Sequence, residues 1–181
     1  MILYETKFLS LKAAKRDGKP DWYYVVRPNA KNIVAILPII KKEDEDEVLF
    51  LITKRPPLEH EHVAEFSVEI PAGLVGDENK SETDNDACKK ELLEETGLVA
   101  DRFELCVSKI STSAGLSDEV CSIYKAYITD DTIKKTPVDD GGVIIDRIKV
   151  KKSKINDFLK QKEQEGASIS ALSLAALYYL E

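Results

Sequence analysis

Apolar and β-branched residues gather in short runs along most of the chain, and their spacing predicts a sheet-rich fold. The runs at 32–40 and 48–53 are almost wholly apolar, which is typical of buried central strands, and the acidic stretch 41–47 between them is expected to be a solvated turn. Further strands are expected at 63–70, 103–110, 120–128 and 143–150, with a turn at Gly141-Gly142 before the last of them.

The N-terminal stretch 3–27 predicts two or three strands, because Arg16-Asp17-Gly18-Lys19 has a strong hairpin signal and 22–26 is rich in β-formers. Pro56-Pro57 is expected to end the strand 48–53. Helices are expected at 82–98, 152–165 and 168–180. This order predicts an α+β fold, with an N-terminal strand segment at 1–30 and one domain at 31–181.

Composition excludes several classes of function. The 181 residues are 43% hydrophobic and 33% charged, which is ordinary for one globular domain, and the net charge of −7 argues against general nucleic-acid binding. No apolar run approaches the roughly 20 residues of a membrane span, and no signal peptide is visible. Cys88, Cys106 and Cys121 lack zinc spacing, so reduced thiols in a cytoplasmic protein are expected.

The helix expected at 82–98 carries three carboxylates on one face. At about 100° per residue, Glu91, Glu94 and Glu95 fall within an arc of roughly 100°. Like charges at this spacing repel one another, but their oxygens suit a hard divalent cation such as Mg²⁺ or, alternatively, Mn²⁺. The pattern predicts metal-dependent chemistry on a phosphate substrate.

The spacing of these residues resembles the Nudix box of the Nudix hydrolases. Glu82, seven further residues and then Lys90-Glu91-Leu92-Leu93-Glu94-Glu95-Thr96-Gly97-Leu98 follow the family pattern, with Lys90 in place of the family's arginine. Upstream, Pro71-Ala72-Gly73-Leu74-Val75 resembles the Pro-Ala-Gly-Leu-Ile stretch of ADP-ribose pyrophosphatases. Gly76 has the family's gap to Glu82, but we prefer Gly73 as the glycine that opens the box, which implies a three-residue insertion before Glu82.

The resemblance implies a Nudix α/β/α sandwich with a mixed central sheet and a role for each residue of the box. Glu91 and Glu95 would be metal ligands, Glu94 a ligand or a catalytic helper, and the carbonyl of Ala72 a further ligand. Glu82 lies about 180° round the helix from Glu91, so a structural role at the helix N-terminus is expected. Gly97 fits a left-handed cap that ends the helix. Lysine carries one compact point charge, whereas arginine makes forked hydrogen bonds, and Lys90 is also expected to have a structural role.

A second stretch, 111–119, is similar to the Ser-Pro-Gly-x-Ser-(Asp)-Glu loop of ADP-sugar pyrophosphatases, with Ala114 in place of a proline linked to ADP-ribose preference. Glu119 is the candidate base or metal ligand, with Asp118 second. Arg55, Glu69 and Gly73 are candidate substrate-binding residues, Arg55 through a phosphate; a surface arginine is the alternative for Arg55. Trp22 or Tyr24 would stack on adenine, and packing in a core or an interface is the alternative for both. The stretch Glu59-His60-Glu61-His62 is expected to be a solvated loop.

Together these features predict Mg²⁺-dependent hydrolysis of the pyrophosphate bond in a small nucleotide substrate, with ADP-ribose or another ADP-sugar giving AMP and a sugar phosphate. Other nucleoside-diphosphate sugars or dinucleotides are the alternative substrates, and capped RNA is disfavoured by the acidic balance. An alternative of another class is a nucleotide-sensing domain that binds without turnover. The resemblance also implies a homodimer that exchanges its N-terminal strands.

Overall fold

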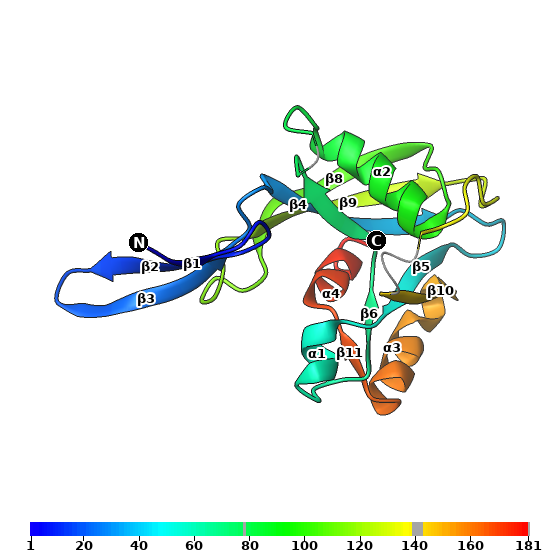
Figure 1. Ribbon diagram of the computed structural model, residues 1–181. Helices are drawn as coiled ribbons and strands as arrows, with labels where there is room; N and C mark the ends of the chain where they lie inside the picture. The colour runs from blue at the N-terminus through cyan, green and yellow to red at the C-terminus, as the bar shows by residue number, and fades with distance from the viewer. Residues whose placement is uncertain (78, 139–142, 181) are drawn as a thin grey trace.

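The computed structural model describes residues 1–77, 79–138 and 143–180, and the body of the described protein is built on a mixed eight-stranded sheet (Figure 1). Its main path runs β11-β6-β5-β4-β9-β8, while β10 pairs with β5 and β7 pairs with β4. The strands of this sheet are β4 (Asn32–Ile40), β5 (Glu47–Thr53), β6 (Phe66–Glu69), β7 (Ala72–Val75), β8 (Arg102–Ser111), β9 (Val120–Ile128), β10 (Ile144–Lys151) and β11 (Ala167–Ile169). The pairs β4–β9 and β11–β6 are parallel and the others antiparallel, as a mixed sheet requires.

Helices cover both faces of this sheet. Alternate residues of β4 enter two separate cores, since successive side chains of a strand point to opposite faces. One core contains residues of α3 (Ile155–Gln164) and α4 (Ala171–Leu177), and the other contains residues of α2 (Asp84–Thr96). This two-sided burial explains why the segment 32–40 is apolar almost throughout, and it confirms the predicted α/β/α sandwich with a mixed sheet.

Helix α2 begins and ends at the signals that its sequence carries. Thr83 is the N-cap, and it exchanges hydrogen bonds with Asp86 in a capping box. Gly97 ends the helix in the left-handed conformation, with φ of 74°, as its position predicts. An added Cβ at Gly97 would also come within 2.5 Å of the carbonyl oxygen of Lys135, so both backbone conformation and close packing require glycine here.

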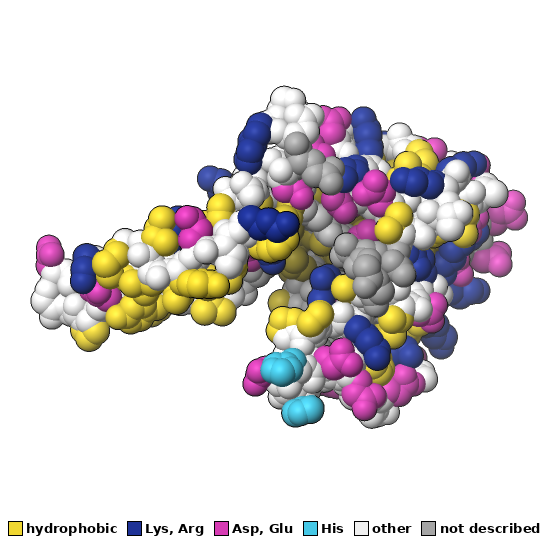
Figure 2. All heavy atoms as spheres, viewed as in Figure 1, with side chains coloured by type: hydrophobic (Ala, Val, Ile, Leu, Met, Phe, Trp, Pro, Cys, Tyr) yellow, Lys and Arg dark blue, Asp and Glu magenta, His cyan; other side chains and the backbone are white. Residues whose placement is uncertain are grey.

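The N-terminal strands form a separate three-stranded antiparallel sheet that projects from the body (Figure 1). It comprises β1 (Ile2–Glu5), β2 (Ser10–Arg16) and β3 (Lys19–Val26), and Gly18, with φ of 67°, lies in the turn between β2 and β3. Apolar side chains gather along the projection (Figure 2), among them the exposed Ile2, Tyr4 and Tyr23. The body begins at Asn32, after a short connection.

Several elements differ from those predicted by sequence. The strand expected at 63–70 begins only at Phe66. Pro56 and Pro57 open a short helix, α1 (Pro56–His60), where only the end of the preceding strand was expected. The segment 72–75, for which no strand was predicted, forms β7. The helix expected at 152–165 starts with a 3₁₀ turn, η1 (Lys152–Lys154). The helix expected at 168–180 is shorter, because its first residues form β11, which extends the sheet beside β6.

The turn expected at Gly141-Gly142 lies outside the described residues. Within the described chain, no helix has the length and apolar character needed to cross a membrane.

Candidate active site

A cavity of about 560 Å³ lies between the second half of α2 and strand β7. Most of the candidate residues from the sequence line it, together with Leu74 of the Pro-Ala-Gly-Leu-Val stretch and three residues that the sequence did not indicate. The lining residues are Arg27, Ile33, Arg55, Ala72, Gly73, Leu74, Glu91, Glu94, Glu95 and Val138. The three carboxylates of the predicted helix face therefore open into one space, beside the Pro-Ala-Gly segment, and the volume is in the usual range for small-ligand sites.

Glu91 is more enclosed than Glu94, with 15% of its side chain exposed against 38%. Its carboxyl group lies against Gly73, where an added Cβ would overlap it. Burial raises the pKa of Glu91 to about 7, Lys90 opposes this shift, and the carboxylates of Glu94, Asp77 and Glu82 add to it. A buried group with a raised pKa in a cavity is a common mark of a functional site.

Glu95 and Glu94 are held by different contacts. The Ala72 N–H donates to Oε2 of Glu95 at 3.1 Å, which ties the helix to β7 at the Pro-Ala-Gly segment. Glu94 lies 3.7 Å from the ammonium group of Lys135, in a half-exposed ion pair. Arg147 donates from Nε to the carbonyl of Glu95 and from Nη2 to that of Val138 at 2.7 Å. Arg147 thus satisfies a helix-terminal carbonyl and joins β10 to the cavity wall.

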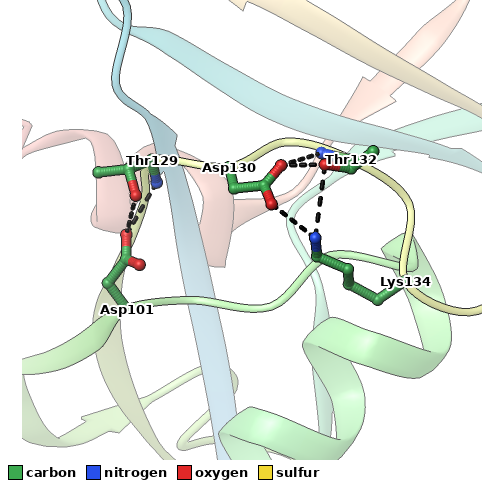
Figure 3. A network of polar contacts seen from close by, with 5 residues as sticks. All are labelled: Asp101, Thr129, Asp130, Thr132 and Lys134. Carbon is green, nitrogen blue, oxygen red and sulfur yellow. Dashed lines mark hydrogen bonds and ion pairs between the residues drawn. The ribbon is translucent and has the colours of Figure 1, made fainter.

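The segment after β9 forms part of the same wall, and polar contacts fix its course (Figure 3). The N–H and hydroxyl of Thr129 both donate to Asp101, at 2.8 and 2.9 Å. Asp130 then accepts from the Thr132 N–H at 3.0 Å and from Lys134 at 2.5 Å. These bonds direct the chain across the C-terminal end of α2, where the Val138 N–H donates to the carbonyl of Glu94 at 2.7 Å.

Arg55 lines the cavity and is anchored by Glu69, which does not line it. Nε of Arg55 donates to Oε1 of Glu69 at 2.9 Å and Nη2 donates to Oε2 at 2.5 Å, so the pairing is forked. Burial alone would raise the pKa of Glu69, but the Arg55 guanidinium outweighs it and holds the pKa below its usual value. Of the three predicted substrate contacts, the structure brings Arg55 and Gly73 to the cavity and places Glu69 outside the lining, where it anchors Arg55.

The remaining residues of the box lie away from the cavity lining. Oε2 of Glu82 accepts from the Gly76 N–H at 2.8 Å, which holds the loop before the helix. Lys90 lies 3.8 Å from Oε1 of Glu91. Glu82 and Lys90 thus contact neighbouring groups from outside the cavity lining, and Gly97 occupies the helix cap.

Glu119 is not part of the cavity lining. It lies in a smaller neighbouring hollow with Asp118, and its Oε1 accepts from Nε of Arg27 at 2.5 Å. Arg27 and Ile33 line both spaces, so they form the wall between them. No sequence pattern indicated Arg27, because it lies in the connection after β3 and belongs to no recognisable motif.

The cavity suits a hard divalent cation by its donor chemistry, because Glu91, Glu94 and Glu95 supply carboxylate oxygens to one space. Among the described residues, however, no three His, Cys, Asp or Glu side chains are gathered into a ready coordination cluster. Ion binding would therefore require these carboxylates to turn from their present partners, Ala72 N–H and Lys135 among them.

A wider hollow of about 800 Å³ lies between the α1 loop and the turn after α3. His62 and three glutamates line it with Lys54, but none of the box carboxylates does. Because the predicted chemistry lies elsewhere, size alone does not make this hollow the active site.

No protein-family model matches the sequence, and no curated protein matches it. The fold is nevertheless shared with a crystal structure described as an ADP compounds hydrolase. The two match with a TM-score of 0.70 over 99% of this chain and 88% of the other, at 14% identity. Similarity at such low identity establishes the fold, while function rests on the residues of the site. The chain therefore has the Nudix-like fold that its sequence predicts.

Proposed function

We propose that this chain is a Nudix hydrolase that cleaves the pyrophosphate bond of nucleoside diphosphate derivatives, with an ADP-sugar such as ADP-ribose as the preferred substrate. The observation that carries the proposal is the convergence of Glu91, Glu94 and Glu95 with Arg55 and the Pro-Ala-Gly segment on one cavity. The protein with the matching fold is described as acting on ADP compounds, which supports the same substrate class.

The reaction adds water across the P–O–P bond and gives AMP and a sugar phosphate. Arg55, fixed by Glu69, binds a phosphate through its guanidinium. Glu119, from the hollow that shares Arg27 and Ile33 with the cavity, would accept the proton of the attacking water, with Glu94 as the second candidate. Glu91 and Glu95, with Glu94 and the Ala72 carbonyl, would hold Mg²⁺ or Mn²⁺. Such an ion neutralises charge on the diphosphate and lowers the pKa of bound water.

Binding without turnover is a second candidate function, because Glu119 is paired outside the cavity and the box has Lys90 in place of arginine. A substrate panel separates the two. ADP-ribose, ADP-glucose, UDP-glucose and diadenosine polyphosphates should be incubated with Mg²⁺ or Mn²⁺ and the products separated by chromatography. The proposal expects the highest kcat/KM with an ADP-sugar. If none of these substrates is hydrolysed but calorimetry shows tight nucleotide binding, the result would favour a nucleotide-sensing domain instead.

We also propose that the projecting sheet packs against a second copy of this chain, forming a homodimer. Apolar side chains gather along this projection (Figure 2), with Tyr4 of β1 66% exposed and Phe8, in the connection to β2, 69% exposed, and large exposed apolar patches mark interaction surfaces. Light scattering coupled to size exclusion should give twice the mass of the 20.3 kDa chain. A mass of one chain at micromolar concentration would contradict this part of the proposal.

A further inference from the structure

The loop that carries Glu119 is held by the projecting sheet. Strand β3 and the residue just after it contact this loop at three successive points, which include a parallel bridge between Val25 and Ser117. The three hydrogen bonds are Trp22 Nε1 to the Gly115 carbonyl at 2.9 Å, Val25 N–H to the Leu116 carbonyl at 2.8 Å and Arg27 Nε to Glu119 Oε1 at 2.5 Å. The position of Glu119 therefore depends on β3.

The guanidinium of Arg27 has donors beyond the one that Glu119 uses. Among the described residues its guanidinium makes one hydrogen bond, through Nε to Glu119, although a guanidinium carries five N–H donors. Its side chain is 48% exposed, and it lines the cavity that contains Glu91, Glu94 and Arg55. The Nη1 and Nη2 groups are therefore available to a ligand, and a phosphate accepts such forked donors well.

We infer that Arg27 bridges substrate and base: its Nε positions Glu119 while its terminal nitrogens bind the diphosphate of the substrate. The inference deepens the proposed function and rests on its substrate class. It makes Arg27 a phosphate-binding and positioning residue, and it links the projecting sheet to the reaction through β3. A lysine at this position has one compact charge, which cannot serve both a carboxylate and a diphosphate in the way that a fork does.

Steady-state kinetics with the best ADP-sugar test the bridge through Arg27→Lys and Arg27→Gln. Arg27→Gln should raise KM and lower kcat, each by about tenfold or more, as expected for loss of charged hydrogen bonds. Arg27→Lys should recover most of the KM effect but little of the kcat effect. Arg102→Gln is the matched control, because Arg102 also forms an exposed ion pair, with Glu104 at 2.9 Å, and lies outside the cavity lining. Equal kinetics for Arg27→Gln and Arg102→Gln would overturn the inference.

A double-mutant cycle isolates the positioning part. If Arg27 acts on kcat through Glu119, then Arg27→Gln should lower kcat of a Glu119→Gln enzyme by less than about twofold. Full additivity of the two kcat effects would refute positioning. Thermal denaturation of each variant should show unchanged cooperativity, which separates a folding defect from the predicted effect. Arg27→Lys is a second control, because it keeps a cation where Arg27→Gln does not.

Calorimetric titration with ADP, in the presence of EDTA, tests the diphosphate contact without turnover. Arg27→Gln should weaken ADP binding by about tenfold relative to Arg102→Gln. If the wild-type protein hydrolyses nothing but shows this difference, the proposed hydrolase function fails and the phosphate contact of Arg27 stands. Equal ADP affinity in the two variants, or no ADP binding by the wild type, would overturn the contact.

Discussion

The carboxyl group of Glu91 occupies the space beside Gly73 that any other residue would fill with its Cβ. Helix α2 packs against strand β7 at this point, and the contact places the predicted metal ligand against the Pro-Ala-Gly segment. The glycine is thus required by the position of the glutamate, not by its own backbone conformation, since Gly73 is not among the glycines with positive φ.

Gly73→Ala should lower the free energy of unfolding by about 1–3 kcal/mol, because the new methyl group displaces the Glu91 side chain from a packed position. It should also reduce kcat/KM, since Glu91 moves. Urea denaturation and kinetics on the same preparations measure both effects.

The control for this prediction is the same change in a Glu91→Ala protein. Alanine at 91 removes the carboxyl and Cγ atoms that an added Cβ at Gly73 would meet. Gly73→Ala should then cost less than about 0.5 kcal/mol, and the coupling between the two substitutions gives the size of the overlap. An equal cost in both backgrounds would show that the clash with Glu91 is not the cause.

Gly97→Ala should be more destabilising than Gly18→Ala, although both glycines have positive φ. Alanine in the left-handed conformation costs about 1–2 kcal/mol at either position. At Gly18 an added Cβ meets nothing within 4 Å, whereas at Gly97 it meets the Lys135 carbonyl and Ile133. We expect a total of about 2–4 kcal/mol for Gly97→Ala, measured by urea denaturation. Equal losses at the two positions would contradict the close packing of 133–137 on the helix cap.

The pairing of Glu69 with Arg55 should make stability depend on pH. The pKa of Glu69 is lowered in the folded protein, so the unfolded chain takes up this proton first as the pH falls. The stabilisation is therefore complete above about pH 5, and it declines as the pH drops through the folded-state pKa. Glu69→Gln should cost about 1–2 kcal/mol at pH 7, a value reduced by the partial exposure of Arg55.

Unfolding curves of the wild type and Glu69→Gln from pH 7 to pH 3 check this dependence. The difference in unfolding free energy should shrink steadily below about pH 5. A difference that stays constant over this range would mean that the charge of Glu69 contributes nothing.

The predictable part of the site is the part that local sequence determines. Helical periodicity places Glu91, Glu94 and Glu95 on one face, and Gly97 marks the helix end, so the spacing alone suffices for both. The two-sided burial of β4 likewise follows from its unbroken apolar run. Both features are present in the structure as predicted.

The part that sequence missed depends on contacts between distant segments. Arg27 meets Glu119 across 92 positions of the chain, and no local pattern encodes that pairing. The ion pair between Glu69 and Arg55 forms because β5 and β6 are neighbours in the sheet. Helix α1 was missed for a different reason: a proline pair after a strand is compatible with both a turn and the first turn of a helix.

The most direct test of the proposed function is the rate of AMP formation from ADP-ribose with Mg²⁺, compared between the wild type, Glu95→Gln and Glu104→Gln. Glutamine at 95 can still accept the Ala72 N–H bond, so the fold should persist, but it removes the negative charge that a metal ion needs. The half-exposed Glu104 is the matched control, since it lies outside the cavity lining. We predict that Glu95→Gln lowers kcat at least about a hundredfold while Glu104→Gln keeps wild-type activity. Full activity of a folded Glu95→Gln enzyme would contradict the account.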